Sequence, residues 1–501
     1  MNRSTQATPV ELTTRPQLLH RNERCAKRRR RRTLAGFLLV SHVLGFASSL
    51  HALMDTRTPQ GAIAWVVALN TVPYLSVPAY WVFGRTKFQG YVISRRDLDS
   101  ELAAALGDTT HALHPFRSHA IGEPHRFGAL EALAKGHFLS GNRLQLLIDG
   151  EATFSSLFEG IESARQYILV QTYILRDDEV GRALQNRLIE QAEAGLDVYL
   201  LYDEIGSYAL PNSYVRELTD AGVNVHRFHS TRGSGNRFQL NFRNHRKVLV
   251  TDGAHGWLGG FNIGVEYMGK DTNIGAWRDT HLRLDGPAAL NLQLSFVEDW
   301  YWATGEILEL PWSPVMAEGN AAVLVLPSGP ADRFDTASLM VQQLIHAARQ
   351  RIWISSPYFV PDEGVQGMLK LAALSGVDVR ILIPEEPDNA LLYFAAYAFI
   401  GPLLDAGVKV HRYQDGFLHG KAILVDDHTA AITTVNLDNR SFRLNFEISA
   451  IVADHDFAGA VESMFRDDFL RSRAMLASKV DEKPFWFRVA SRAAYMLAPV
   501  L

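Results

Sequence analysis

The stretch that decides the fold reads Asn244-His245-Arg246-Lys247-Val248-Leu249-Val250-Thr251-Asp252, and the chain carries a second copy, His419-Gly420-Lys421-Ala422-Ile423-Leu424-Val425-Asp426. Each copy has the form His-x-Lys, four further residues and Asp. In each copy the Lys leads directly into an apolar run typical of a buried strand, where alternation would place His and Lys on the same face. We therefore expect two imidazoles and two ammonium groups to converge on one site.

Two imidazoles beside two ammonium groups suit chemistry at a phosphodiester. The ammonium groups compensate charge on the phosphoryl oxygens, one imidazole attacks phosphorus, and the other protonates the departing alkoxide. The two motif aspartates follow a buried run, so we expect them to anchor loop backbone or to pair with a cation. The candidate catalytic residues are those of the repeated motif: His245, Lys247, Asp252, His419, Lys421 and Asp426.

Sequence upstream of the motif also repeats in the same order. Ala164-Arg165-Gln166 recurs as Ala348-Arg349-Gln350, and residues 218–227 recur as residues 403–412, at offsets of 184 and 185 residues. The two motif histidines are 174 residues apart, which predicts an insertion in the first half, around residues 232–240. Alternating strand and helix patterns predict an α/β fold of two duplicated domains with pseudo-twofold symmetry. The expected domains are residues 140–312 and 313–470.

The composition restricts the class of protein. With 501 residues, of which 47% are hydrophobic, the chain has material for more than one compact unit. The formal net charge of -4 does not favour a protein that coats nucleic acid. A single cysteine, Cys25, excludes an internal disulfide bond and a cysteine-built metal site. We expect neither a metal nor a cofactor in the chemistry.

The amino-terminal part predicts a membrane anchor. A polar tail, residues 1–32, ends in the basic block Lys27-Arg28-Arg29-Arg30-Arg31-Arg32. Two uncharged runs follow, residues 33–54 and 61–84, and each is long enough to cross a bilayer. We therefore expect residues 33–84 to form two transmembrane helices in a hairpin.

The distribution of charge predicts the orientation of this hairpin. Basic residues flank both outer ends, whereas the connecting turn carries only Arg57 beside Asp55. Since Lys and Arg concentrate on the cytoplasmic side, both outer flanks are expected in the cytoplasm. A signal peptide cleaved near Ala47-Ser48-Ser49 is the competing interpretation of the first run, and the second run opposes it. The basic residues after the second run are Arg85, Lys87, Arg95 and Arg96.

The repeated motif resembles the mark of the phospholipase D superfamily, His-x-Lys-x4-Asp-x6-Gly-(Gly/Ser)-x-Asn in two copies. The first copy fits, with Gly259-Gly260-Phe261-Asn262, whereas the second has Thr433-Thr434-Val435-Asn436 at this place. Two copies at the correct internal spacing are a specific signal. Within the superfamily, the chain resembles bacterial cardiolipin synthases in three features. These are the two apolar runs near the amino terminus, the segment Trp277-Arg278-Asp279-Thr280-His281, and residues 436–447.

This resemblance implies a reaction. Two phosphatidylglycerol molecules in a bacterial inner membrane would give cardiolipin and glycerol through a phosphohistidine. A neutral imidazole suits attack on an anionic phosphodiester, because its ordinary pKa of about 6.5 leaves it mostly unprotonated near pH 7. We expect His245 to be the nucleophile and His419 to act first as acid and then as base, although sequence alone allows these roles to be exchanged.

The resemblance also implies supporting residues. Asn262 and Asn436 would hold phosphoryl oxygens together with the two lysines. A histidine that attacks and later leaves needs a carboxylate to fix its tautomer. The expected pairing is crossed between the halves, Asp279 with His419 and Glu447 with His245.

Other interpretations stay open on the sequence. The same motif serves a phospholipase, or a phosphatidyltransferase that uses another alcohol such as ethanolamine. The apolar runs and the charge balance argue against a nuclease of the superfamily. The complete set of His, Lys and Asn residues argues against a catalytically silent scaffold. The expected partners are phosphatidylglycerol and membrane lipid, without nucleic acid, and the sequence leaves a homo-oligomer open.

Several segments allow more than one interpretation. Trp277 and Arg278 suit either contact with a lipid phosphate or structural support. The apolar residues 391–400 suit an acyl path, bilayer contact or a buried helix. An amphipathic C-terminal segment, residues 471–501, suits the membrane interface, packing on the core or packing on another subunit. Residues 85–139 are expected to form a juxtamembrane connector.

Overall fold

The chain divides into two compact units, Met1–Thr86 and Lys87–Leu501. The expected insertion near residues 232–240 lies outside the described residues, as do Arg57, Arg85 and Lys87, three of the charges used to orient the hairpin. The computed structural model describes residues 15–56, 58–84, 88–101, 111–118, 127–229, 241–270, 275–386, 388–478 and 482–498.

Within its described residues, the first unit has one helix that is long and apolar enough to cross a membrane. This helix, α1 (Arg15–Asp55), has 41 residues. The candidate membrane segment, Ala26–Asp55, contains both the basic block and the first expected span. The basic block therefore continues into the same helix as the apolar run.

The expected second transmembrane helix, residues 61–84, is broken at Val72. The backbone there has φ -133° and ψ 54°. The residue before a proline avoids helical backbone, and Pro73 has no N–H with which to continue the helix. The helix before the break has only 13 residues, too few to cross a bilayer by itself. The three segments are α2 (Pro59–Thr71), α3 (Pro73–Ala79) and the π-helical turn η1 (Tyr80–Gly84).

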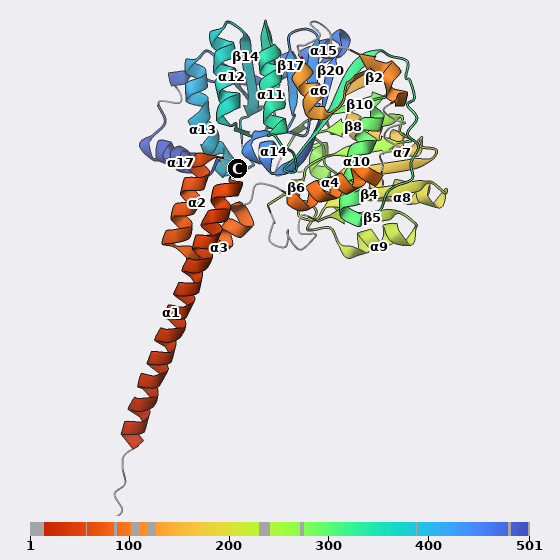
Figure 1. Cartoon of the computed structure of the whole chain (residues 1–501). Coiled ribbons are helices and arrows are strands. Elements are labelled where there is room, and N and C mark those ends of the chain that lie inside the picture. The colour runs from red at the N-terminus through yellow and green to blue at the C-terminus, as the bar shows by residue number, and fades with distance from the viewer. Residues whose placement is uncertain are drawn as a thin grey trace, which may run out of the picture. The chain divides into compact units, whose positions relative to one another are not determined.

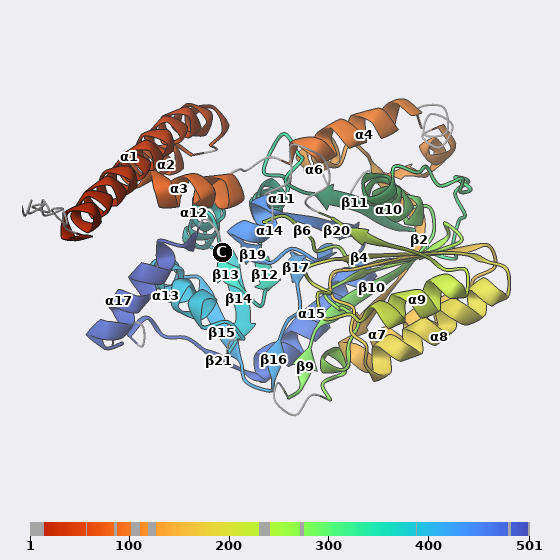
Figure 2. The ribbon, with the colours of Figure 1, turned by 90° about the horizontal axis from the view of Figure 1, so that it is seen from below.

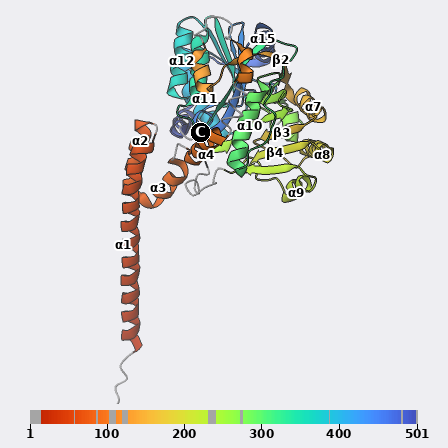
Figure 3. The same ribbon diagram turned by 45° about the vertical axis from the view of Figure 1, so that its right-hand side comes forward.

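These segments pack along α1 (Figure 3). Asn70 Nδ2 donates a hydrogen bond to Ser49 Oγ at 2.7 Å, and Trp81 Nε1 donates to Ser48 Oγ at 3.1 Å. The polar side chains of the broken segment and of α1 therefore satisfy one another within the first unit.

In the second unit, the strands of the first half form a mixed sheet in the order β5-β4-β3-β7-β8-β10-β2. The first three strands are parallel to one another, and each later neighbour is antiparallel. The strands are β2 (Phe138–Ile148), β3 (Tyr167–Thr172), β4 (Asp197–Asp203), β5 (Asn224–Phe228), β7 (Val248–Thr251), β8 (His255–Gly259) and β10 (Thr280–Asp285).

The second half repeats this order and these directions as β15-β14-β12-β17-β18-β20-β11. The long strand β2 belongs to both halves, because it pairs with β11 near its start and with β10 over its later part. The predicted duplicated α/β fold is confirmed. The strands are β11 (Ala321–Ser328), β12 (Arg351–Ser355), β14 (Asp378–Pro384), β15 (Lys409–Tyr413), β17 (Ala422–Val425), β18 (Thr429–Thr433) and β20 (Asn445–Ala453).

Helices cover both faces of this continuous sheet. In the first half, α7, α8 and α9 lie together along one side (Figure 2), and in the second half α11 and α12 lie beside β14 and β17 (Figure 1). The helices are α4 (Gln89–Glu101), α6 (Gly128–Ala134), α7 (Asp149–Glu162), α8 (Glu179–Glu193), α9 (Asn212–Asp220), α10 (Ala289–Thr304), α11 (Thr336–Ala347), α12 (Glu363–Leu374), α13 (Ala390–Asp405), α14 (Asn439–Arg443), α15 (His455–Leu470) and α17 (Phe485–Tyr495).

The apolar run after each His-x-Lys is a buried strand, as predicted. In β7, Val248 and Val250 face a core that both halves share, whereas Leu249 faces the core beneath α7 and α8. In β17, Leu424 faces the shared core and Ile423 the core beneath α11 and α12. Because each face of the sheet buries alternate side chains, the register of both motif strands is fixed.

Several short elements complete the fold, and two of the pairs they form join the halves. β6 runs parallel to the start of β20, and β16 runs parallel to β9. β1 extends the sheet beside β2, β21 lies beside β15, and β13 pairs with β19. These elements are η2 (His114–Phe116), β1 (Arg117–Ser118), β6 (Arg243–Asn244), η3 (Val265–Met268), β9 (Trp277–Arg278), β13 (Phe359–Val360), β16 (Phe417–Leu418), β19 (Leu437–Asp438) and β21 (Ser472–Ala474).

Candidate active site

Each His-x-Lys segment is held by the opposite half of the chain. The N–H of His245 donates to the carbonyl oxygen of Phe446 at 2.9 Å, directly after the β6–β20 pair. The N–H of His419 donates to the carbonyl oxygen of Arg278 at 2.7 Å, directly after the β16–β9 pair. The next residue on each bracing strand is an acid, so the backbone pairing delivers a carboxylate from one half to the histidine of the other.

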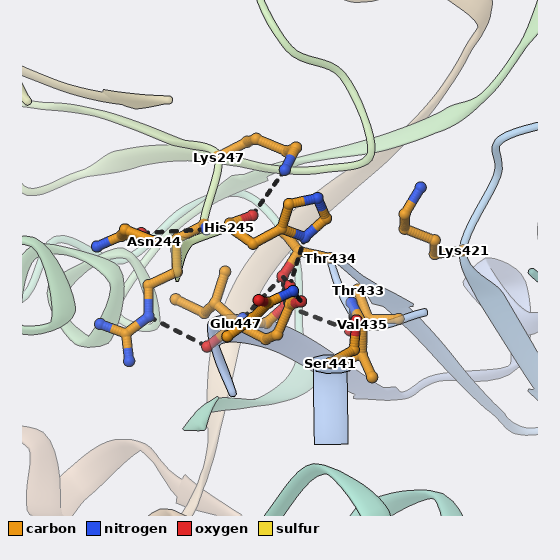
Figure 4. A network of polar contacts seen from close by, with 12 residues as sticks. Asn244, His245, Lys247, Lys421, Thr433, Thr434, Val435, Ser441 and Glu447 are labelled. Atoms are coloured by element: carbon orange, nitrogen blue, oxygen red, sulfur yellow. Dashed lines mark hydrogen bonds and ion pairs between the residues drawn. The ribbon is translucent and has the colours of Figure 1, made fainter. Parts of the chain in front are cut away.

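The two histidines and two carboxylates form crossed pairs. His245 Nδ1 lies 2.9 Å from Glu447 Oε2, and His419 Nδ1 lies 2.6 Å from Asp279 Oδ2. Both carboxylates are fully buried. The first pair, with the dashed contact between His245 and Glu447, is visible in Figure 4. The structure thus has the crossed arrangement that the resemblance led us to expect.

The two lysines lie against these histidines. Lys247 Nζ donates to the carbonyl oxygen of His245 at 2.7 Å, and Lys421 Nζ donates to that of His419 at 2.6 Å. Lys421 Nζ also lies 3.0 and 3.2 Å from the ring nitrogens of His419. In Figure 4 the Lys421 side chain lies beside the His245 ring, on a different side of it from Glu447. Side chains from both motif copies therefore lie near one another.

Burial and the lysine charges make both imidazoles weak bases. Burial, with the nearby ammonium groups, lowers the pKa of His245 to about 4 although Glu447 acts in the opposite direction. Burial and Lys421 lower the pKa of His419 to about 4 against the pull of Asp279. Lys421 contributes to the lowering at His245, and Lys247 contributes at His419, so the two copies are electrostatically coupled. Both imidazoles are neutral near pH 7.

The same surroundings act on the lysines and the carboxylates. Burial lowers the pKa of Lys247 to about 7 and that of Lys421 to about 8. Burial alone would raise the pKa of Asp279, but Lys421 and His419 together hold it below its ordinary value. For Glu447, burial is likewise overcome by His245 and the lysine charge, so the pKa is lowered. Both carboxylates are therefore ionised.

The departure of the second copy from the superfamily pattern has a structural reason. A Cβ atom at Gly260 would lie 1.9 Å from Asp279 Oδ1, so the first copy needs glycine there. At the corresponding place in the second copy, the Thr434 hydroxyl donates to Glu447 Oε2 at 2.5 Å. Thr433 Oγ1 lies 2.6 Å from Ser449 Oγ on β20. The two threonines thus use their hydroxyl groups to hold the carboxylate and its strand.

The two asparagines differ in their bonding. Asn262 accepts from the N–H of Ile174 at 3.2 Å and donates to the Tyr267 hydroxyl at 3.0 Å. The side-chain oxygen of Asn436 is buried and has no hydrogen-bond partner among the described residues. Asn262 therefore supports the loop after β3 and keeps one further amide donor, whereas Asn436 keeps an unused acceptor.

The motif aspartates lie away from the histidines, at the far ends of β7 and β17. Asp252 Oδ1 accepts from the N–H groups of Gln166 and Tyr167 at 2.8 and 3.1 Å, at the start of β3. Asp426 makes the equivalent bonds at the start of β12, including one from Gln350 at 2.8 Å. Both aspartates have left-handed backbone, with φ of 54° and 55°. They anchor backbone in equivalent places of the two halves.

Arg278 and Trp277 belong to the frame around the site. The Arg278 guanidinium is buried and donates twice to Asp468, with both distances 2.8 Å. It is thus committed to structural support and not to a lipid phosphate. The Trp277 ring lies 4.9 Å from the His419 ring, and its Nε1 lies 3.4 Å from Asp279 Oδ2. Trp277 therefore limits how the imidazole of His419 can tilt.

Comparison with known proteins identifies the relatives of this chain. The family model described as cardiolipin synthase, phospholipase D-like domain, matches residues 157–300 and 341–469. Cardiolipin synthase A of Pseudomonas aeruginosa is 46% identical over 475 residues, which cover 94% of this chain and 96% of that protein. The chain belongs to the cardiolipin synthase family. A relative in the family, cardiolipin synthase A of Pseudomonas putida, is 45% identical over 93% of this chain and 98% of its own length.

Two further comparisons concern the amino-terminal segment and the overall fold. A family model described as phospholipase D-nuclease N-terminal matches residues 43–85, which include the end of α1 and all of the broken segment. The crystal structure of phosphatidylserine synthase from Haemophilus influenzae Rd KW20 matches with a TM-score of 0.59 at 16% identity, over 75% of this chain and 100% of that one. At this identity the match shows a shared fold and nothing about substrate.

Sequence reasoning missed several residues that build the site of this family member. The Tyr173 ring lies 4.9 Å from that of His245. Its counterpart in the second half, Tyr358, is 185 residues away, so the repeat offset itself could have drawn attention to the pair. Asp299 on α10 was also missed, and no local motif signals it. Its carboxylate accepts hydrogen bonds from Tyr91, Gln171, Asn244 and Arg246.

Within the described ranges, no group of three or more His, Cys, Asp or Glu side chains is arranged to hold a metal ion. The site instead offers two neutral imidazoles, two ammonium groups and two ionised carboxylates. A phosphodiester anion would meet a nucleophile on one side, a proton-transfer group on the other and positive charge between them.

Proposed function

We propose that this protein is a membrane phosphatidyltransferase that condenses two phosphatidylglycerol molecules to cardiolipin and glycerol. The observation that carries the proposal is the crossed pairing of two His-x-Lys segments with Glu447 and Asp279. The near full-length similarity to proteins named cardiolipin synthase A supports the choice of lipid substrate.

In the first half-reaction, His245 attacks the phosphorus atom of one phosphatidylglycerol. Glu447 accepts a hydrogen bond from the Nδ1–H group, which keeps the proton on Nδ1, so the Nε2 lone pair is free to form the P–N bond. The bond between phosphorus and the glycerol oxygen breaks, and His419 gives its Nε2 proton to that oxygen. Glycerol leaves, and the phosphatidyl group remains on His245.

This step needs a protonated His419, although its pKa in the unliganded protein is about 4. The substrate carries a negative charge into the space between the lysines, and this charge favours the imidazolium. Asp279, ionised and 2.6 Å from Nδ1, stabilises the same form. Substrate binding thus supplies the protonation state that the acid requires.

In the second half-reaction, the neutral His419 takes the proton from a hydroxyl group of a second phosphatidylglycerol. The freed oxygen attacks phosphorus, the P–N bond to His245 breaks, and cardiolipin forms. Lys247 and Lys421 compensate the charge that builds on the phosphoryl oxygens in both steps. Both histidines return to their starting states.

We place the protein in a bacterial inner membrane, with the catalytic unit on the cytoplasmic side. The apolar part of α1 supports an anchor. The basic block of this helix, which directly precedes its uncharged run, supports a cytoplasmic amino-terminal flank. Anchoring brings the covalent intermediate to lipid hydroxyl groups before bulk water, which favours transfer over hydrolysis.

The proposal is tested by product analysis. Purified protein in vesicles is given phosphatidylglycerol labelled separately in its acyl chains and its free glycerol, and lipids are separated by chromatography. We expect one glycerol released for each cardiolipin formed. Phosphatidic acid without cardiolipin would show a hydrolase instead, and a dominant phosphatidylethanolamine product in a parallel sample with ethanolamine would show a different acceptor.

A further inference from the structure

The C-terminal helix α17 presents three different faces. Phe487 and Ala494 are buried, and the Phe487 ring packs 4.9 Å from Tyr397 and 5.1 Å from Phe394 on α13. The outer face is apolar and exposed, and its Phe485, Trp486 and Met496 side chains are 74%, 62% and 74% accessible. A helix docked by one apolar face thus carries a second apolar face that no other described part of the second unit covers.

The third face of α17 is basic and borders a cavity. This cavity, of about 290 Å³, lies between α13 and α17, and three cations line it against one acid, Asp405. Arg488 and Arg492 are one helical turn apart on α17, and Lys483 precedes the helix. No ion pair involves these three cations among the described residues, which leaves their charge available to an anion.

A polar side chain in the cavity wall is also without a partner. Ser491 is 5% accessible, and its hydroxyl makes no hydrogen bond within the described part of the chain. It lies on α17 between the two arginines and lines the same cavity. A buried hydroxyl without a partner costs free energy, and an anion oxygen in the cavity would remove that cost.

We propose that the cavity between α13 and α17 binds the headgroup phosphate of an anionic membrane phospholipid, and that this second lipid site docks the catalytic unit on the bilayer. The apolar outer face enters the acyl boundary, while the arginines beside it stay at the depth of the phosphates. The occupant is a bilayer lipid and not a free phosphate, because the exposed aromatic face adjoins the basic one on the same helix.

Charge sets the size of the expected effect. A basic residue close to an anionic bilayer contributes on the order of 1 kcal/mol, which corresponds to about a fivefold change in the docking equilibrium. Replacing both arginines should therefore weaken docking on anionic lipid about 25-fold if their effects are independent. Docking on neutral lipid should be weak with or without them.

The test places a spin label on the outer face of α17 in the full-length protein. The native cysteine is removed as Cys25→Ser, Val489→Cys is labelled with a nitroxide, and the protein is reconstituted in nanodiscs of phosphatidylcholine with or without phosphatidylserine. We expect a membrane-inserted label, accessible to oxygen but not to a water-soluble relaxation agent, only with phosphatidylserine. Arg488→Gln with Arg492→Gln should return the label to water.

A matched pair serves as control. Arg165→Gln with Arg216→Gln removes the same charge from exposed positions elsewhere on the second unit and should leave the label inserted. Two results would overturn the proposal. In one, the label stays in water in nanodiscs that contain phosphatidylserine. In the other, the label inserts equally well when Arg488 and Arg492 are replaced. Inorganic phosphate in neutral nanodiscs should not insert the label, and insertion there would overturn the assignment to a lipid.

Discussion

At the scale of single residues, Glu447 has the most specific task. Its carboxylate is fully buried, accepts from Thr434 and lies 2.9 Å from His245 Nδ1. A carboxylate in this position keeps the proton on Nδ1 and leaves Nε2 free to attack. Glu447 therefore supports catalysis by fixing the tautomer and the orientation of the imidazole, and not by contact with lipid.

Glu447→Gln should lower kcat by a factor of about 10² to 10⁴, because an amide can stabilise the wrong tautomer of His245 and cannot stabilise an imidazolium. The measurement is steady-state cardiolipin formation, with thermal unfolding to check the fold. Glu462→Gln, on α15, makes the same chemical change at a carboxylate paired with Arg351 and Arg466, and should retain kcat. Near-normal turnover of Glu447→Gln would remove this residue from the mechanism.

The lowered pKa values of the lysines predict a pH profile. Lys247 and Lys421, with pKa values of about 7 and 8, compensate phosphate charge only while protonated. kcat/KM should therefore fall as pH rises through this range, since it reports groups of the free enzyme. Because the pKa of His245 is about 4, its free base is present throughout the neutral range. A kcat/KM that stays constant to about pH 10, near the ordinary lysine pKa, would contradict these charge roles.

At the scale of elements, the bonds of Asp426 lead us to expect a stabilising role for this motif residue and no part in the chemistry. Its carboxylate accepts from the N–H groups of residues 349–351, where β12 begins, and its φ of 55° is a conformation that Asn also tolerates. Asp426→Asn should lower the free energy of unfolding by about 1.5–3 kcal/mol, because a charged acceptor is lost while the backbone fits.

Well below the unfolding temperature, Asp426→Asn should keep kcat close to the wild-type value. Thermal unfolding in detergent and cardiolipin formation are measured on the same preparations. The neighbouring Asp427→Asn is the control, because Asp427 is exposed. A large loss of kcat in Asp426→Asn without any loss of stability would mean that the aspartate acts in the chemistry.

The elements also show what the sequence could and could not predict. The repeat offsets were sufficient to predict two equivalent halves, because an insertion changes the spacing between repeated segments but not the order in which they occur. The apolar runs after the two His-x-Lys segments correctly predicted buried strands, but not that Val248 and Leu424 face a core shared by both halves. The break at Val72 was missed because the apolar composition of residues 61–84 is that of a continuous span, whereas Pro73 acts through backbone geometry.

The sequence predicted less of the site than of the fold. The two crossed pairs depend on short strand pairings that no pattern of hydrophobicity reveals. The pairing of β6 with β20 brings Glu447 to His245, and the pairing of β16 with β9 brings Asp279 to His419. Asp299 accepts hydrogen bonds from four side chains that come from three separate segments of the sequence. Only the resemblance to a known family suggested the crossed carboxylates in advance.

At the scale of the whole molecule, membrane topology follows from whether the broken segment crosses the bilayer. In a hairpin, the amino-terminal tail and the catalytic unit lie on the same side, whereas a single span through α1 would separate them. We expect the hairpin arrangement. The native Cys25 and, in a Cys25→Ser background, Ser163→Cys report the two sides.

Both cysteines should resist a membrane-impermeant maleimide in intact spheroplasts, and both should react after lysis. A cysteine substituted at Asp55, in the expected turn, is the control and should react in intact spheroplasts. If only one of the two cysteines, Cys25 or the cysteine at position 163, reacts before lysis, the chain crosses the membrane once.

The central claim is that both halves build one site, in which His245 carries the phosphatidyl group and His419 moves protons. A phosphatidyl ester of p-nitrophenol needs no acid to release its leaving group, so it separates these roles. His419→Asn should release one p-nitrophenolate per protein in a burst and retain a phosphatidyl adduct that mass spectrometry locates on His245. His245→Asn should give no burst, and both variants should lose cardiolipin formation. A burst from His245→Asn with the adduct on His419, or cardiolipin formation that persists in either variant, would contradict the account.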